Sequence, residues 1–206
     1  MPGQEALQPL EVRVGRLLAA RRMTLAVAES CTGGLVGHRL TNVPGSSEYF
    51  LGGVMAYANE TKERLLGVSH GTLVDHGAVS EETAREMARG ARRVLGADVA
   101  VAVTGIAGPG GGTPDKPVGL TWVALSEGDD ELACRYVWDG DRERNKAHSA
   151  EAALRLVFEP RQFLQNHFHC RHRPLRLYRR IDHSRAGVLE AIHVGMDVVD
   201  QAALFP

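Results

Sequence analysis

Residues 24 to 40 predict a strand followed directly by a helix, and this unit constrains the fold more than any other segment of the sequence. The apolar run Thr24 to Ala28 predicts a buried strand, and the pattern Leu35 to Leu40 predicts a helix. Small polar residues and two glycines, Glu-Ser-Cys-Thr-Gly-Gly, join them. This junction leaves backbone N–H groups and a hydroxyl at the positive end of the helix, which attracts anions and developing negative charge. The alternative is a plain turn in which a Ser or Thr caps the helix.

The same alternation of strands and helices continues along the chain. Apolar runs predict further strands at residues 54–57, 98–103, 120–126 and 132–137, with a separate short apolar piece at 49–51. Helical spacing predicts helices at 7–22, 59–66, 81–95 and about 142–157, and residues 68–79 read as a loop. A Gly-Asp-Asp turn between the last two strands suits an antiparallel hairpin. The sequence therefore predicts an α/β fold with a mixed sheet.

Composition excludes several classes of protein. The 206 residues are 44% hydrophobic and 24% charged with a formal net charge of −1, which argues against a general nucleic-acid binder. No apolar run is long enough to span a bilayer, and the N-terminus lacks the pattern of a signal peptide. Three cysteines without paired spacing argue against a disulfide framework. We therefore expect a cytoplasmic protein.

The character of the chain changes near Phe158, which predicts two parts: a domain over residues 1–157 and a basic, His-rich tail over residues 158–206. The tail contains His167, His169, Cys170 and His172, and such side chains are zinc ligands. Their spacing fits no zinc motif, so we predict no metal site. A solvated basic tail or a partner-binding one is the interpretation that we prefer.

Three polar or glycine-rich segments each follow a predicted strand. They are the turn around Ser30, the segment Tyr57 to Lys62, and the long loop Thr104 to Gly119. In open α/β sheets ligands bind beyond the carboxyl ends of the strands, so one cleft could collect all three. A loop of this length inside a compact domain is usually functional or disordered.

Ser30 would need a base to act as a nucleophile. No His follows a strand as a Ser-His-Asp triad would require, whereas desolvation would lower the pKa of Lys62, and Ser–Lys pairs are known. Tyr57 could relay a proton. From spacing alone Lys62 could equally be a solvated cation on a short helix. Cys31 is a rival nucleophile at the same turn, or a small buried filler residue.

The glycine-rich loop offers free N–H groups suited to a phosphate or an oxyanion. It is neither a P-loop nor a dinucleotide fingerprint, so a mobile surface loop remains the alternative. Arg142 could clamp a phosphate, or could simply be exposed at the end of the hairpin.

Taken together, these motifs resemble the CinA C-terminal domain family over roughly residues 8 to 157. The motifs that carry the resemblance, in order, are Ala28-Glu-Ser-Cys-Thr-Gly-Gly34, Pro44-Gly-Ser-Ser47, Phe50-Leu-Gly-Gly-Val54, Tyr57-Ala-Asn-Glu-Thr-Lys62, His76-Gly-Ala-Val-Ser-Glu81, Thr104-Gly-Ile-Ala-Gly-Pro-Gly-Gly-Gly112, Lys116-Pro-Val-Gly119 and Gly140-Asp-Arg142. The resemblance implies a three-layer α/β/α domain. It also implies hydrolysis of the carboxamide of nicotinamide mononucleotide to nicotinate mononucleotide and ammonia, without metal or cofactor.

The resemblance further implies roles for individual residues. Ser30 would be the nucleophile, with Lys62 and Tyr57 as its activating partners. A second group would bind substrate or hold the oxyanion: Thr32, Gly33, Ser46, Ser47, Thr104, Gly105, Gly108 and Arg142. The resemblance also points to a homo-oligomer that binds a small nucleotide, with no membrane or nucleic-acid partner.

Two alternatives stay open. The domain could bind a nucleotide, or serve a competence pathway, without catalysis. The basic tail could recruit nucleic acid or a partner. Many longer relatives carry a further N-terminal domain with pyrophosphatase activity, and because this sequence starts at the amidohydrolase-like unit we expect no such second activity.

Overall fold

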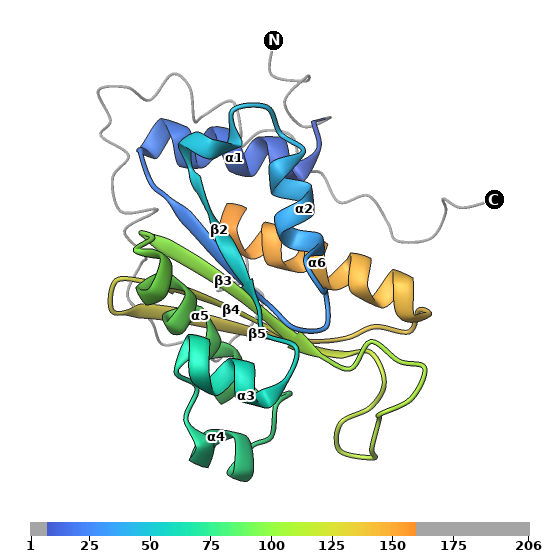
Figure 1. The fold of residues 1–206 in the computed structure, drawn as a ribbon. Helices are drawn as coiled ribbons and strands as arrows, with labels where there is room; N and C mark the ends of the chain where they lie inside the picture. The colour runs from blue at the N-terminus through green and yellow to red at the C-terminus, as the bar shows by residue number, and fades with distance from the viewer. Residues whose placement is uncertain (1–7, 160–206) are drawn as a thin grey trace, which may run out of the picture.

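The computed structural model describes residues 8–159, and the predicted tail lies outside this range except for its first two residues, Phe158 and Glu159. The described chain forms a five-stranded sheet covered by helices on both faces (Figure 1). This is the three-layer α/β/α arrangement expected from the sequence. Among the described residues no helix is long and apolar enough to cross a membrane.

The sheet has the strand order β2-β1-β3-β4-β5. Its strands are β1 Leu25–Glu29, β2 Phe50–Met55, β3 Val99–Gly105, β4 Leu120–Glu127 and β5 Asp130–Val137. The first three strands are parallel, β4 is antiparallel to β3, and β5 is antiparallel to β4. The predicted mixed sheet and terminal hairpin are therefore confirmed. The carboxyl ends of β1, β2 and β3 all lie at one edge of the sheet (Figure 1).

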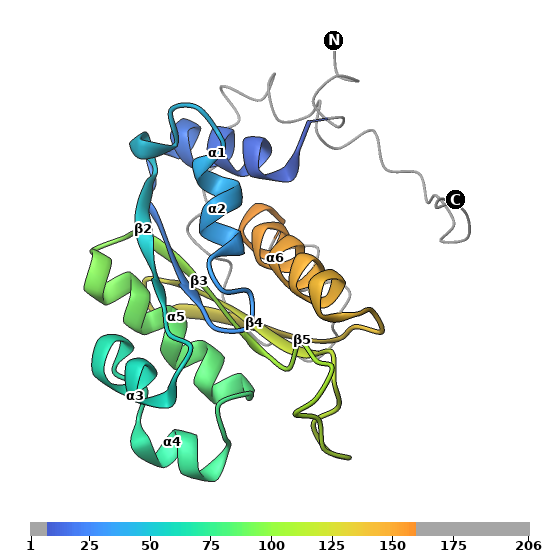
Figure 2. The same ribbon diagram turned by 45° about the vertical axis from the view of Figure 1, so that its right-hand side comes forward.

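Three helices cover one face of the sheet, and a second group covers the other (Figure 2). The first group is α1 Leu10–Arg21, α2 Leu35–Thr41 and α6 Arg142–Phe158. The second is α3 Asn59–Thr61, which runs directly into a π-helical turn, η3 Lys62–Leu66, followed by α4 His70–Asp75 and α5 Glu81–Leu95.

The central strands divide their side chains by size between two hydrophobic cores. Val27, Val101 and Val103 point to the core under α1, α2 and α6. Ala26 and Ala28 point to the core under α5, where small side chains dominate. Alternate residues are thus buried on opposite faces, which explains why these strands read as continuous apolar runs.

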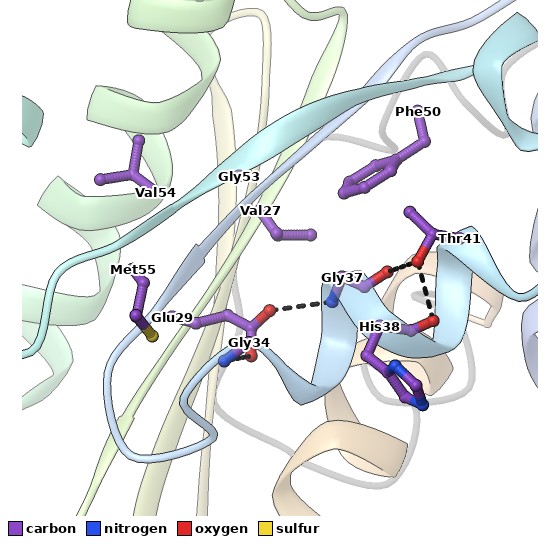
Figure 3. A pocket seen from close by; sticks show the side chains of 10 residues that line it. All are labelled: Val27, Glu29, Gly34, Gly37, His38, Thr41, Phe50, Gly53, Val54 and Met55. Carbon is purple, nitrogen blue, oxygen red and sulfur yellow. Dashed lines mark hydrogen bonds between the residues drawn. The ribbon is translucent and has the colours of Figure 1, made fainter.

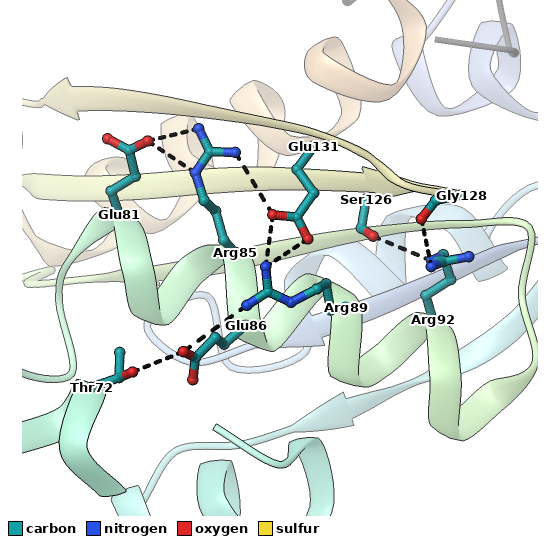
Figure 4. Close-up of polar contacts among 9 residues, drawn as sticks. All are labelled: Thr72, Glu81, Arg85, Glu86, Arg89, Arg92, Ser126, Gly128 and Glu131. Carbon is teal, nitrogen blue, oxygen red and sulfur yellow. Dashed lines mark hydrogen bonds and ion pairs between the residues drawn. The ribbon is translucent and has the colours of Figure 1, made fainter. Parts of the chain in front are cut away.

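Helix α5 has the boundaries that its sequence predicts. The Ser80 hydroxyl accepts the N–H of Thr83 at 3.2 Å, and Gly96 ends the helix in the left-handed conformation with φ 64°. Towards the sheet, Arg85 and Arg89 pair with Glu131 of β5 (Figure 4). Its buried apolar residues are Ala84, Met87, Ala88 and Ala91, whereas the side chain of Val94 is exposed.

Several local predictions are wrong. Strand β2 begins at Phe50 and runs through Gly52 and Gly53, so the two apolar pieces are one strand. The predicted loop 68–79 contains the short helix α4. The helix predicted at 59–66 is a short α-helix followed by the π-helical turn η3.

Candidate active site

Ser30 lies immediately after β1, between the ends of the two neighbouring strands. Its N–H donates to the Val103 carbonyl of β3 at 3.0 Å. On the other side, the N–H of Ala56, just beyond β2, donates to the Glu29 carbonyl at 2.8 Å. These bonds fix the turn at the carboxyl edge of the sheet, as the topology predicts.

Glu29 closes the positive end of α2. Its buried carboxylate accepts the N–H groups of Gly34 at 3.0 Å and Gly37 at 2.8 Å (Figure 3). It also accepts the N–H group of Val36 at 3.1 Å. We expected this end to attract an anion, and the anion is Glu29 of the chain itself. The carboxylate therefore holds the turn and neutralises the helix dipole there.

The remainder of the turn is tightly built. Gly33 has φ 62°, which favours glycine, and its N–H donates to the Ser30 carbonyl at 3.2 Å. The Thr32 side chain is buried, and its hydroxyl has no hydrogen-bond partner within the described residues. Neither Ser30 nor Thr32 provides the cap of α2, because Glu29 does so.

Lys62 is buried beside this turn, with only 1% of its surface exposed. Its Nζ donates to the carbonyl oxygens of Ala56 at 2.8 Å and Tyr57 at 3.1 Å. Burial lowers the pKa of Lys62, while the charges of Cys31 and Glu60 act in the opposite direction. The alternative of a solvated surface cation is therefore wrong.

A neutral amine suits these contacts. It has two N–H groups, and the two carbonyls take both of them. Its lone pair then remains free to accept a proton. The π-helical turn begins at Lys62 itself, and such turns are frequent at functional sites.

Cys31 has the character of a filler residue. Burial raises the pKa of its thiol to about 12, although its own N–H and that of Thr32 act to lower it. A side chain on Gly105 of β3 would lie 3.1 Å from the Cys31 sulfur, so the strand approaches the thiol closely. A thiol that stays protonated near neutral pH is a poor nucleophile.

Arg142, the first residue of α6, contacts both the glycine-rich loop and Tyr57. Its Nη1 donates to the Gly108 carbonyl of the glycine-rich loop at 2.7 Å, and its Nη2 lies 3.4 Å from the Tyr57 hydroxyl. Tyr57 is 64% exposed, so its ring stands at the open side of the site. The structure thus brings Ser30, Lys62, Tyr57 and Arg142 to one edge of the sheet.

The glycine-rich loop is anchored at several points. The Thr104 hydroxyl donates to the Ala78 carbonyl at 2.7 Å, and Asn145 of α6 donates to the Ala107 carbonyl at 3.1 Å. Lys116 binds the His76 carbonyl. Ala107 and Gly108 are buried, and within residues 8–159 their N–H groups have no hydrogen-bond partner. These two N–H groups are candidates for holding an oxyanion.

Four of the predicted substrate-binding residues have contacts or positions that bear on their roles, and for Thr104 and Gly105 the role stays a prediction. The hydroxyl of Thr104 is committed to Ala78, and Gly105 serves close packing against Cys31. Ser46 and Ser47 lie in the 3₁₀ turn η2 Ser46–Glu48, just before β2. Because β1 and β2 are parallel, this turn is at the opposite edge of the sheet from Ser30 (Figure 1). Within one chain, these two serines do not join the site.

Sequence reasoning missed Asn145 and Lys146 on the first turns of α6. The side chain of Lys146 is half-buried, and a Cβ at Gly33 would lie 3.8 Å from its Nζ. The signal was present: Arg142 and Lys146 are four residues apart, so they share a helix face.

A pocket of about 180 Å³ lies beside the site, between α2 and the edge strand β2 (Figure 3). Glu29 and Met55 belong to its lining, but Ser30, Lys62 and Arg142 do not. Among the described residues, no group of three or more His, Cys, Asp or Glu side chains could hold a metal ion.

The site can be compared with those of known proteins. The family model of the CinA C-terminal domain matches residues 7–160. A CinA-like protein from Chlorobaculum tepidum is 56% identical over 151 residues, which cover 71% of this chain and 36% of that protein. A putative competence-damage inducible protein from Moorella thermoacetica is 51% identical over 149 residues, covering 72% of this chain and 36% of that protein. The chain thus spans little more than a third of these relatives.

Solved structures agree with the family match. A competence-damaged protein (CinA) superfamily protein from Klebsiella pneumoniae is 36% identical with a TM-score of 0.71, covering 73% of this chain and 94% of that chain. The competence/damage inducible protein CihA from Agrobacterium tumefaciens is 39% identical with a TM-score of 0.69, covering 73% and 96%. The chain therefore belongs to the CinA C-terminal domain family.

Proposed function

We propose that this domain hydrolyses the carboxamide of nicotinamide mononucleotide to nicotinate mononucleotide and ammonia. The observation that carries the proposal is the buried Lys62, whose two carbonyl contacts and lowered pKa suit a general base beside Ser30. The substrate follows from the family resemblance of the sequence.

In this mechanism the Ser30 hydroxyl attacks the amide carbon while the Lys62 amine takes its proton. Negative charge then develops on the amide oxygen, and the N–H groups of Ala107 and Gly108 would hold it. Lys62 returns the proton to the leaving nitrogen, so ammonia departs and Ser30 is acylated. A water, deprotonated by the same amine, attacks the ester, and nicotinate mononucleotide leaves with Ser30 regenerated.

Tyr57 and Arg142 would orient the substrate at the open side of the site. Arg142 donates N–H groups to the Gly108 carbonyl and the Tyr57 hydroxyl. Because a guanidinium has five N–H groups, others remain to donate to a ligand. The exposed Tyr57 hydroxyl can bind the substrate or pass a proton.

The test is direct measurement of both products. The purified protein is incubated with nicotinamide mononucleotide, ammonia is measured by a coupled assay, and nicotinate mononucleotide by chromatography. We expect stoichiometric release of both, and loss of release in Ser30→Ala. Full activity of Ser30→Ala would contradict the mechanism, and no release by the wild-type protein would contradict the function.

A second candidate is a nucleotide-binding protein without catalysis that serves a competence pathway. The name of one relative, a putative competence-damage inducible protein, favours it because that name refers to competence. Calorimetric binding of the mononucleotide by the wild-type protein, without any release of ammonia, would support this candidate over the amidase.

A further inference from the structure

The peptide unit between Ala107 and Gly108 is held by its carbonyl. The Ala107 carbonyl oxygen accepts the side-chain amide of Asn145 at 3.1 Å. A peptide unit is planar and trans, so its N–H points away from its C=O. The contact that fixes the Ala107 carbonyl therefore also fixes the direction of the Gly108 N–H, which no hydrogen bond uses within residues 8–159.

The two neighbouring peptide units do not depend on a side chain in this way. In the preceding unit, the Ile106 carbonyl accepts the backbone N–H of Gly119 at 2.7 Å, and this contact fixes the direction of the Ala107 N–H. The following unit has no N–H at all, because residue 109 is proline. Of these three units, only the one between Ala107 and Gly108 has an available N–H whose direction a side chain determines.

Asn145 is buried, and stability alone does not explain its amide. Only 1% of its surface is exposed. One of its N–H groups donates to the Ala107 carbonyl, whereas its Oδ1 atom is buried and has no hydrogen-bond partner among the described residues. A buried polar atom without a partner is unfavourable for folding, and an apolar side chain would avoid that cost. The opposite orientation of the amide would place its oxygen against the Ala107 carbonyl, so this contact also decides which way the amide points.

Asn145 is itself held by the next turn of α6. The Ser149 hydroxyl, also buried, donates to the Asn145 backbone carbonyl at 2.7 Å and accepts the indole N–H of Trp138 at 3.0 Å. Trp138 follows β5, and its backbone N–H donates to the Gly119 carbonyl at 3.1 Å. A chain of hydrogen bonds therefore joins α6, the end of β5 and the base of the glycine-rich loop.

Arg142 contacts the same loop but cannot replace Asn145. Its Nη1 donates to the Gly108 carbonyl at 2.7 Å. That carbonyl belongs to the following peptide unit, which has no N–H to orient. Arg142 is also exposed, so water competes for its contacts, whereas Asn145 is shielded from water.

We propose that Asn145 is a positioning residue, which holds the Ala107–Gly108 peptide unit so that the Gly108 N–H is aimed at the developing oxyanion. This inference rests on the proposed function, because the oxyanion forms only when Ser30 attacks an amide. A donor that is already fixed needs no reorganisation as the negative charge develops. Asn145 acts through the peptide unit and not on the substrate.

The kinetic test is Asn145→Leu, which removes the donor together with the unpartnered Oδ1. We expect kcat for nicotinamide mononucleotide to fall about 10- to 100-fold. This is less than the loss of an oxyanion donor outright, because the Gly108 N–H is still present but no longer held. KM should stay within about threefold of the wild type, since the interaction belongs to the transition state. Asn145→Ala is the second variant and should show the same split, so the test does not depend on whether leucine fits.

Nuclear magnetic resonance relaxation of the Gly108 ¹⁵N–H group tests the positioning without turnover. We expect an order parameter of about 0.85 in the wild type and below about 0.6 in Asn145→Leu and Asn145→Ala. A role confined to overall stability would not change the order of this one N–H in the folded protein.

Ser126→Ala is the matched control. Ser126 is buried and accepts the Nε–H of Arg92 at 3.2 Å, so this change also removes a hydrogen bond of a buried side chain. Ser126 pairs with Ala100 near the start of β3, at the opposite edge of the sheet from Ser30. Both kcat and the Gly108 order parameter should stay at the wild-type values.

The two measurements separate this inference from the proposed function. If the wild type releases ammonia and Asn145→Leu keeps the wild-type kcat, the positioning role fails and the amidase stands. A lower kcat with an unchanged Gly108 order parameter would also overturn the role, because the loss would not pass through this peptide unit. If the wild type releases no ammonia, the amidase fails. Asn145 then holds the peptide unit if the order parameter falls in the variants, and does not if it is unchanged.

Discussion

The amine of Lys62 is buried, and this burial predicts how kcat/KM changes with pH. Because burial lowers its pKa, the amine loses its proton at a lower pH than the ordinary lysine value of about 10.4. We expect kcat/KM to rise with pH through that lowered value, since only the neutral amine can accept the Ser30 proton. A pH–rate profile checks this. A profile that is flat over the range where the protein remains folded would contradict it.

The same shift affects stability. The unfolded chain binds the Lys62 proton more tightly than the folded chain, so this residue reduces stability below its folded pKa. The cost disappears as pH rises towards the unfolded value. In Lys62→Met we expect a loss of roughly 10³-fold or more in activity with the fold retained by circular dichroism, and a smaller rise of the urea midpoint with pH than in the wild type.

Cys31 neighbours the proposed nucleophile, but its thiol should take no part in the reaction. Its pKa of about 12 keeps it protonated near neutral pH. We predict that Cys31→Ala retains activity within a few-fold, and that iodoacetamide at neutral pH leaves the folded protein unlabelled. The paired variant is Ser30→Ala, one residue away, for which we expect loss of activity. An inactive, well-folded Cys31→Ala would make the thiol the better nucleophile.

The sequence could predict a site residue only where its position before or after a strand was enough to place it at the site. Ser30 and Lys62 lie in segments that follow strands, so topology indicated that they could meet, whereas Arg142 was named only as a possible phosphate clamp at the end of the hairpin. Ser46 and Ser47 precede a strand, and the parallel arrangement of β1 and β2 puts them at the other edge. The role of Glu29 depends on three backbone N–H groups whose directions no spacing reveals.

At the scale of the elements, α2 depends on Glu29 more than on its own sequence. The helix has only seven residues, too short to be stable alone, and its first N–H groups are held by one carboxylate. We predict that Glu29→Ala lowers the free energy of unfolding by about 2–4 kcal/mol, because the N–H groups lose a buried charged acceptor.

Urea unfolding measures this loss. Glu29→Gln is the second variant to measure. Its amide oxygen can still accept a hydrogen bond, but its NH₂ group would face a backbone N–H donor. Its free energy of unfolding should therefore lie between those of the wild type and Glu29→Ala. Glu48→Ala, at an exposed position, is the control. A Glu29→Ala variant as stable as the control would mean that the carboxylate does not hold α2.

The elements missed by the sequence interpretation owe their structure to neighbours. Gly52 and Gly53 weaken the strand signal of β2, yet Gly53 is required there, since a side chain would overlap Val27. Helix α4 has only six residues, and Glu86 of α5 binds both the Ser69 N–H and the Thr72 hydroxyl. Such tertiary support leaves no periodic pattern in the sequence.

At the scale of the molecule, residues 8–159 contain both hydrophobic cores and the whole candidate site. The chain of the Klebsiella pneumoniae structure is covered to 94% by this one, so little of that chain lies outside the shared unit. We predict that a chain ending at residue 159 keeps full activity and unfolds within about 2 °C of the complete chain. A large loss of either on truncation would show that residues 160–206 contribute to the domain.

The homo-oligomer expected from the sequence stays a prediction. On the described surface, Met55 and Leu65 are large apolar side chains that are more than half exposed, and Val74 is another. We expect light scattering coupled to size exclusion to give at least twice the mass of one chain at micromolar concentration. A single-chain mass would contradict it.

The closure of α2 by Glu29 has a consequence for how this domain can diversify. Because the carboxylate that accepts the N–H groups at this helix end comes from the chain itself, no ligand is needed there. Under the proposed function, residues that contact the substrate could then be exchanged without disturbing the turn that carries Ser30.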